Sequence, residues 1–444
     1  MGLMQRRDFN QTAQRQRVAI AGFGLEGRAI LDYLQPRGGD LDITILDEAQ
    51  VDVPEGVKSD LRPDVFDGEL DYDVVWRASP AIAPRRLKTS APVMTMTGEF
   101  LARCPAPVIG VTGTKGKGTT AALIAKILES AGPKTHLVGN IGVPALSVLS
   151  DIKDGELVVF ELSSFQLWDA KASPPVAVVL MIEPDHLDVH KDINDYVQAK
   201  SNIARWQGEG GVVIYHPDNP LTAKAAEVGL GRKIKYLTSQ GCYIRNGQLV
   251  IDEQNICSTK ELGLLGEHNL ANAAAAVTAA WQFTQDITSV ASALKTFTGL
   301  PHRLQIIASK HQVDYVDDSI STTPSSAIAA LNTFADRPTV IILGGSDKGA
   351  DFTPLAEQLA GMGTATAKAL LMGDTTGKLR VVLDKAGFKD YEAIAGGMAT
   401  VVKRASQLAR PGGVVLLSPA CASFDMFKDY QDRAQQFKAA VDKL

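Results

Sequence analysis

The stretch that decides the fold is residues 107–120, which read PVIGVTGTKGKGTT. Its apolar part predicts a buried strand over 108–112, and residues 121–128 (AALIAKIL) predict a helix. The glycines between them permit a tight turn in which backbone N–H groups and a helix N-terminus face an anion. An ordinary glycine-rich turn is the simpler alternative, but two lysines and several threonines in one turn favour a nucleoside triphosphate. The residues expected to hold it are Gly113, Thr114, Gly116, Lys117, Gly118, Thr119 and Thr120.

This loop matches the end of a Walker A pattern with one displacement. Gly118 stands where Ser or Thr is usual, so the hydroxyl that would contact Mg²⁺ moves to Thr119.

Composition places the chain among ordinary soluble globular proteins. Of its 444 residues, 45% are hydrophobic and 21% are charged, and the net charge is −5. The acidic balance argues against a nucleic-acid partner, and no apolar run is long enough to predict membrane insertion. The four cysteines are far apart and form no metal-binding pair, which suits a reducing cytoplasm. We expect a cytoplasmic protein.

Strand-like and helix-like segments alternate along the chain, which predicts an α/β protein with parallel sheets. The clearest strands outside the loop are 18–21, 43–46, 339–343 and 413–417. Prolines at 105 and 107 and the turn TGLP at 298–301 predict two joints. We expect three domains: a Rossmann-like domain at 1–105 with a tail at 1–16, a P-loop ATPase-type domain at 106–299, and a Rossmann-like domain at 300–444.

A second glycine motif, GFGLEG at 22–27, follows the first of these strands, and Asp47 ends the next strand. The pattern is that of dinucleotide-binding loops, in which the acid contacts a ribose hydroxyl. It is weakly specific by itself, so NAD, another nucleotide and a purely structural turn all remain compatible with it.

Polar residues in the middle of the chain lie where parallel sheets bind ligands, at the carboxyl ends of strands. Glu161 could hold Mg²⁺ beside phosphates or be a surface acid, and EPDHLD at 183–188 could be a ligand-binding or merely solvated loop. Lys200, on a predicted helix over 194–206, would by itself be assigned to the surface. His268 and Asn269 could cap a helix or contact a purine.

Taken together, these segments resemble the Mur ligases, the ATP-dependent amide-forming enzymes of peptidoglycan synthesis. The resemblance extends from Val18 to the C-terminus. Besides the loop at 113–120, it rests on ELSSFQ (161–166), DHLD (185–188), AK (199–200), GEHNLAN (266–272), LPHR (300–303), DS (318–319), GGSDKG (344–349) and LSPACAS (417–423).

The resemblance implies ATP and two Mg²⁺ ions as cofactors. Lys117 and Thr119 would hold the phosphates and the first Mg²⁺, with Glu161 nearby; His186 and Lys200 would serve the second, Lys200 as a carbamate offering oxygen ligands. The implied catalytic residues are Lys117, Glu161, His186, Lys200 and Lys348. The remaining nucleotide contacts would be Asn269, Asn272, Arg303 and Asp318.

The resemblance also implies the other substrates, UDP-N-acetylmuramoyl-L-alanine and glutamate. We expect the protein to be a monomer. The UDP-sugar would be contacted by Leu25, Asp47, Ser79, Asn140, Ser163 and Gln166. The glutamate would be contacted by Thr322, Lys348, Ser423 and Tyr430. The alanine carboxylate would attack the γ-phosphate to give an acyl phosphate, from which the glutamate amine displaces phosphate.

Some residues depart from the family pattern. Gly118 resembles the loop of folylpolyglutamate synthetases, Glu26 stands where a hydroxyl residue is frequent, and Ile320 replaces a common lysine. A folylpolyglutamate synthetase-like ligase and a variant that adds L-glutamate are therefore alternatives. A nicotinamide oxidoreductase and a non-catalytic P-loop ATPase are the rivals from other classes.

Overall fold

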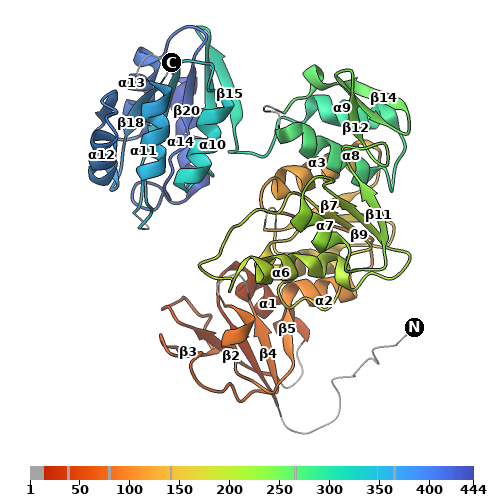
Figure 1. Ribbon diagram of the computed structural model, residues 1–444. Coiled ribbons are helices and arrows are strands. Elements are labelled where there is room, and N and C mark those ends of the chain that lie inside the picture. The colour runs from red at the N-terminus through yellow and green to blue at the C-terminus, as the bar shows by residue number, and fades with distance from the viewer. Residues whose placement is uncertain are drawn as a thin grey trace. The chain divides into compact units, whose positions relative to one another are not determined.

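The computed structural model describes residues 15–37, 41–78, 82–140, 143–264, 266, 268–347, 349–363 and 367–444. It confirms an α/β protein in which parallel strand pairs dominate. The chain divides into two compact units: Met1–Leu262 with Glu267–Phe297, and Gly263–Gly266 with Thr298–Leu444. The first unit contains two separate parallel sheets (Figure 1). The joint expected near residue 105 falls between these sheets, and the three-domain division stays a prediction. No helix in the described ranges is long and apolar enough to cross a bilayer.

The first sheet has the order β3-β2-β1-β4-β5, with every pair parallel. Its strand order changes direction at β1, so the carboxyl ends of β1, β2 and β4 meet at one edge, where open α/β sheets bind ligands. The strands are β1 (Gln16–Ala21), β2 (Leu41–Asp47), β3 (Lys58–Leu61), β4 (Val74–Arg77) and β5 (Val93–Thr95). The helices are α1 (Leu25–Leu34) and α2 (Met96–Arg103).

The second sheet has the order β11-β10-β9-β6-β8-β7 and is also entirely parallel. Strand β6 (Val108–Thr112) is wholly buried between β9 and β8, as its apolar sequence predicts, and helix α3 (Lys117–Ser130) follows it. The other strands are β7 (Thr135–Gly139), β8 (Leu157–Glu161), β9 (Val176–Val179), β10 (Val212–Tyr215) and β11 (Arg232–Lys235). The helices are α4 (Ala145–Val148), α5 (Ser164–Leu167), α6 (Ile193–Arg205) and α7 (Pro220–Ala226).

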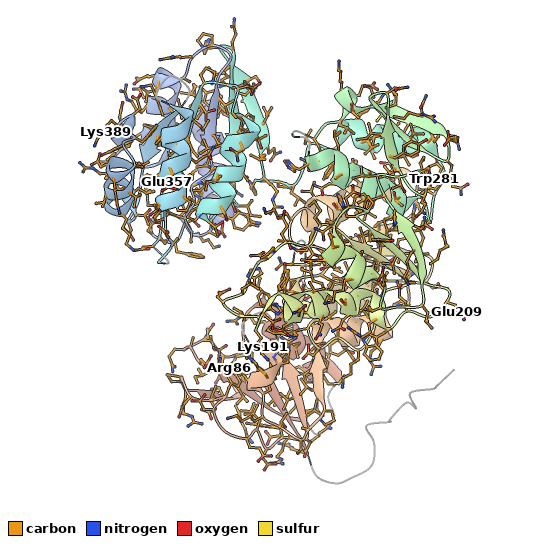
Figure 2. The ribbon with its side chains drawn as sticks, viewed as in Figure 1. Arg86, Lys191, Glu209, Trp281, Glu357 and Lys389 are labelled. Carbon is orange, nitrogen blue, oxygen red and sulfur yellow. The ribbon has the colours of Figure 1, made fainter. Side chains whose placement is uncertain are left out.

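A small antiparallel sheet completes the first unit: β12 (Tyr243–Arg245), β13 (Gln248–Ile251) and β14 (Gln254–Ser258). Helices α8 (His268–Ala280) and α9 (Ile287–Thr296) pack against α3. Trp281, which follows α8 and is labelled in Figure 2, donates its indole N–H to Asp252 Oδ2 at 2.7 Å. This bond ties the turn between β13 and β14 to the end of α8.

The second unit is built on a sheet of order β15-β16-β20-β17-β18-β19, parallel except for the β15–β16 pair. One apolar core buries α10, α11 and α12 on one face, and another buries α13 and α14 on the other (Figure 1). The strands are β15 (Gln305–Lys310), β16 (Val313–Asp317), β17 (Thr339–Leu343), β18 (Ala367–Leu371), β19 (Tyr391–Ala393) and β20 (Val414–Leu417). The helices are α10 (Pro324–Thr333), α11 (Thr353–Met362), α12 (Thr376–Lys385), α13 (Met398–Leu408) and α14 (Tyr430–Asp442).

A buried arginine joins the two parallel sheets of the first unit. Arg77, the last residue of β4, is 1% exposed, and its Nε and Nη2 bond the two carboxylate oxygens of Asp169 at 2.8 and 2.5 Å. Its Nη2 also donates to the Phe165 carbonyl at 2.8 Å, and its Nη1 donates to the Ile82 carbonyl at 3.1 Å. Such bidentate pairs fix orientation as well as distance. Arg77 therefore anchors the chain after β4 to the α5 region of the second sheet.

We expect Arg77→Met to lower the free energy of unfolding of the first unit by about 3 kcal/mol, because it leaves Asp169 and two carbonyl groups without their cation. All four tryptophans lie in this unit, so urea unfolding followed by tryptophan fluorescence measures it. The matched control is Arg245→Met, which breaks the exposed Arg245–Glu253 pair and should change stability far less, because solvent screens an exposed pair. Equal effects of the two substitutions would contradict this role of Arg77.

Candidate active site

The glycine-rich loop at 113–120 lies between β6 and α3, as the sequence predicts. Gly116 has a φ of +81°, and a Cβ on it would lie 2.4 Å from Asn272 Oδ1, so only glycine fits there. Lys117 Nζ donates to the Thr114 carbonyl at 3.0 Å. The structure thus brings the loop against Asn272, one of the expected nucleotide contacts. Asn272 in turn donates to Asn269 Oδ1 at 2.8 Å, so both asparagines lie in one buried group on α8.

The residues of the loop fit a phosphate group and Mg²⁺. The N-terminus of α3 has no side-chain cap, so its first backbone N–H groups can face an anion. Thr120 Oγ1 is buried and has no hydrogen-bond partner among the residues that the structure describes, and Thr119 and Glu161 offer further buried oxygen atoms. Within the described ranges no three His, Cys, Asp or Glu side chains form a metal-binding group. A Mg²⁺ ion at Thr119 and Glu161 would therefore be completed by phosphate oxygens and water, as this ion commonly is.

Lys200 lies beneath this loop and is buried, so assignment to the helix surface would have been wrong. Its Nζ donates to the Gly113 carbonyl at 2.7 Å and lies 4.6 Å from the centre of the Tyr196 ring. Burial holds the pKa of Lys200 well below its ordinary value, and the charge of Lys117 lowers it further, whereas Glu161 and Asp185 act in the opposite direction. A lowered pKa favours the neutral amine, which is the form that can react with carbon dioxide.

The DHLD segment forms an exposed loop after β9. His186 is in the left-handed region at a φ of 52°, and its Nε2 lies 3.5 Å from Asp185 Oδ2. Nearby, Lys115 pairs with Glu183 at 3.2 Å, and the Thr114 hydroxyl donates to the Glu183 carbonyl at 3.0 Å. The glycine-rich loop is thus joined by an ion pair and a hydrogen bond to the segment that leads into the DHLD loop.

Sequence patterns did not single out His190, which anchors the DHLD loop from inside. Its backbone N–H donates to the His186 carbonyl at 2.8 Å. Its ring is buried 3.9 Å from the Trp168 ring, with Nδ1 3.2 Å from Asp195 and Nε2 3.0 Å from the Ser164 hydroxyl. Burial is the largest cause that lowers the pKa of His190, which favours the neutral ring. The sequence contains only one indication of it: His190 follows His186 by four residues, and this spacing alone does not indicate a functional role.

The expected UDP-sugar residues come from both sheets of the first unit. Ser163 caps α5 with Gln166, and Gln166 Nε2 donates to Glu26 Oε1 of the GFGLEG loop at 2.8 Å. Asp47 accepts a hydrogen bond from the Phe23 backbone N–H at 2.8 Å, which closes the same glycine loop. Leu25 is 79% exposed, Asn140 is also exposed, and Ser79 lies outside the described residues.

In the second unit, Asp318 is one of the two most deeply buried expected ligand contacts, together with Ser423. Its Oδ2 accepts from the Ser418 hydroxyl at 2.7 Å and its Oδ1 accepts from the Leu304 N–H at 3.1 Å. Burial raises the pKa of Asp318 to about 6. Ser423 is buried, and Tyr430 is half-buried at the start of α14. Arg303 and Thr322 are exposed, and Lys348 lies outside the described residues.

An open parallel sheet with an uncapped glycine-rich loop on its central strand defines the P-loop class of α/β proteins. Models of the Mur ligase middle domain and of the Mur ligase glutamate ligase domain match residues 111–280 and 302–421. The chain is 34% identical, over 98% of both sequences, to the UDP-N-acetylmuramoylalanine–D-glutamate ligase of Clostridium botulinum strain 657. It is 33% identical to the ligase of the same name from Clostridium kluyveri, over 98% of this chain and 99% of the relative. The chain therefore belongs to the Mur ligase family, which confirms the expected class, an amino-acid ligase of peptidoglycan precursor synthesis.

Solved structures support the same fold. MurF from Acinetobacter baumannii matches with a TM-score of 0.62 at 16% identity, covering 96% of this chain and 93% of that chain. MurC from Thermotoga maritima matches with a TM-score of 0.58 at 18% identity, covering 96% and 99%. At these identities the likeness concerns the fold alone.

The buried Asp318 makes stability depend on pH. A carboxyl whose pKa is higher in the folded than in the unfolded protein loses stabilisation as the pH rises from the unfolded to the folded pKa. With a rise from 3.8 to about 6, we expect the unfolding free energy of the wild type, relative to Asp318→Asn, to be about 2 to 3 kcal/mol lower at pH 7 than at pH 4. Urea unfolding followed by circular dichroism measures this difference, and a difference that does not vary with pH would contradict the assignment.

Proposed function

We propose that this chain is an ATP-dependent ligase that joins D-glutamate to UDP-N-acetylmuramoyl-L-alanine. The observation that carries the proposal is the buried Lys200 Nζ, 2.7 Å from the Gly113 carbonyl, beneath a phosphate loop at an uncapped helix N-terminus. Relatives named for this reaction, similar over 98% of the chain, support the choice of substrates.

The main electrostatic obstacle is repulsion between an anionic carboxylate and an anionic phosphate. In this proposal Lys117 and the first N–H groups of α3 offset the phosphate charge, and Asn269, Asn272, Arg303 and Asp318 orient the nucleotide. ATP, bound with Mg²⁺, supplies the γ-phosphoryl group. The substrate carboxylate takes that group to form an acyl phosphate and ADP. The amine of glutamate then attacks the carbonyl carbon, and phosphate leaves with one of the former carboxylate oxygens.

Two metal sites form part of the proposal. Thr119 and Glu161 would hold one Mg²⁺ at the phosphates, where oxygen ligands suit a hard cation. His186 and Lys200 would hold the other, with Lys200 carbamoylated. The depressed pKa of Lys200 supports this role, because a neutral amine is the nucleophile that a carbamate requires.

The remaining contacts divide between the two substrates. For the UDP-sugar we propose Leu25, Asp47, Ser79, Asn140, Ser163 and Gln166. The bond from Gln166 to Glu26 supports this set, since it joins the glycine loop of the first sheet to the segment that follows Glu161. For glutamate we propose Thr322, Lys348, Ser423 and Tyr430.

The direct test is ADP release by the purified protein with ATP, Mg²⁺ and UDP-N-acetylmuramoyl-L-alanine, with each glutamate enantiomer offered in turn. We expect release to require both the UDP-sugar and the amino acid, and to be at least 10-fold faster with D-glutamate. Preference for L-glutamate would contradict the enantiomer but not the ligase. Release supported by a folate in place of the UDP-sugar, or independent of any amino acid, would contradict the proposal.

A further inference from the structure

A completely buried arginine lies behind the expected amino-acid residues of the second unit. Arg433, in the first turn of α14, is 0% exposed. All three of its nitrogen atoms donate hydrogen bonds: Nε to the Ser319 hydroxyl at 2.9 Å, Nη2 to the Ser319 carbonyl at 2.7 Å, and Nη1 to the Cys421 carbonyl at 3.1 Å. The guanidinium therefore bonds the chain after β16 to the chain after β20.

These bonds also reach the start of α14. The Ser319 hydroxyl, which accepts from Arg433, donates to the Tyr430 carbonyl at 2.8 Å. One side chain thus fixes three segments, at Ser319, Cys421 and Tyr430. The same segments carry Asp318, Ser423 and Tyr430, all expected ligand contacts. A shift of Arg433 would displace all three segments together.

The charge of Arg433 is not neutralised by contact. Among the residues that the structure describes, no carboxylate lies within ion-pair distance of it, although Arg77, equally buried, has the bidentate partner Asp169. Asp317 and Asp425 act on it only at longer range. Asp429, the N-cap of α14, and Asp432, in the first turn of that helix, accept hydrogen bonds from backbone N–H groups. Burial lowers the pKa of Arg433 to about 10, so the group is still a cation at neutral pH.

A buried cation without an adjacent anion is strongly unfavourable, because the protein replaces its hydration only in part. A buried Arg433 is explained if a ligand in the occupied site supplies negative charge. The amino acid of the proposed reaction has two carboxylates, and it would sit against the segments that Arg433 holds. The electrostatic attraction between a bound anionic ligand and a cation that lies one layer behind the site is strong when water is excluded from the site.

We propose that Arg433 is a positioning and charge-selecting residue of the amino-acid site. It holds the segments at Ser319, Cys421 and Tyr430 in place, and its positive charge favours an acidic over a neutral amino acid. It is not assigned a contact with the ligand. This inference rests on the proposed function, the ligation of glutamate.

The test compares glutamate with glutamine, which differs by one charge at almost the same size. We expect Arg433→Met to raise KM for glutamate at least 10-fold, to change KM for ATP less than 2-fold, and to lower the glutamate-over-glutamine preference in kcat/KM at least 10-fold. Arg433→Lys keeps the charge with fewer donors, so it should lose part of kcat but keep the preference within about 3-fold. Arg380→Met, an exposed residue of α12, is the control and should change neither value.

Each outcome bears on the inference. An unchanged preference in Arg433→Met, or an equal loss in Arg433→Lys, would show a purely structural residue and overturn charge selection. If Arg433→Met does not fold, Ser319→Ala provides the second measurement: it removes the hydroxyl but keeps the charge, and should raise KM for both amino acids equally. A change in preference in Ser319→Ala would overturn the inference. If the wild type releases no ADP with any amino acid, the proposed function itself fails. If the wild type is active and only the variants behave otherwise than expected, the inference about Arg433 fails and the proposed function stands.

Discussion

The hydrogen bond from Lys200 Nζ to the Gly113 carbonyl is the constraint on which the candidate site depends. It places a titratable amine in the interior, directly under the loop that would hold phosphates, at a distance of 2.7 Å. The loop is held in turn by Thr114, which bonds the chain after β9, and by Gly116, which leaves room for Asn272. These contacts come from three different segments, so together they restrict the conformations open to the loop.

The two buried arginines, Arg77 and Arg433, have different roles. Arg77 has a carboxylate partner in bidentate geometry, which explains it fully as a link between two sheets. Arg433 bonds only hydroxyl and carbonyl oxygens within the described residues. Arg77 is therefore a stabilising residue. The charge of Arg433 has no adjacent carboxylate among the described residues, and the carboxylates of the proposed substrate would account for it.

The sequence predicted the helices and strands that are determined by the residues of the segment itself. The strand over 108–112, the helix after the glycine loop and the strand over 339–343 follow from apolar runs bounded by turns, and the structure confirms them. The resemblance to Mur ligases, carried by many ordered motifs, is confirmed at the level of the family. The small antiparallel sheet of β12–β14 was not predicted, because its strands are short and partly exposed.

Burial of individual polar residues could not be predicted, because it depends on segments distant in sequence. Lys200 looks like a surface lysine on an amphipathic helix, and only the packing of α6 against β6 shows that it is interior. Arg77 and His190 were missed for the same reason: their partners, Asp169 and Ser164, are contributed by the chain after β8. The assigned roles of the site residues stay predictions until they are measured.

The most direct measurement of the central claim is ADP release by Lys200→Ala under the conditions that the wild type requires, with and without added bicarbonate. Removal of the buried amine should abolish most of the activity, and bicarbonate should not restore it, because no amine remains to carbamoylate. Lys224→Ala, which removes an exposed lysine of α7, should retain wild-type turnover. Unimpaired turnover by Lys200→Ala would contradict the claim that this lysine is the centre of the site.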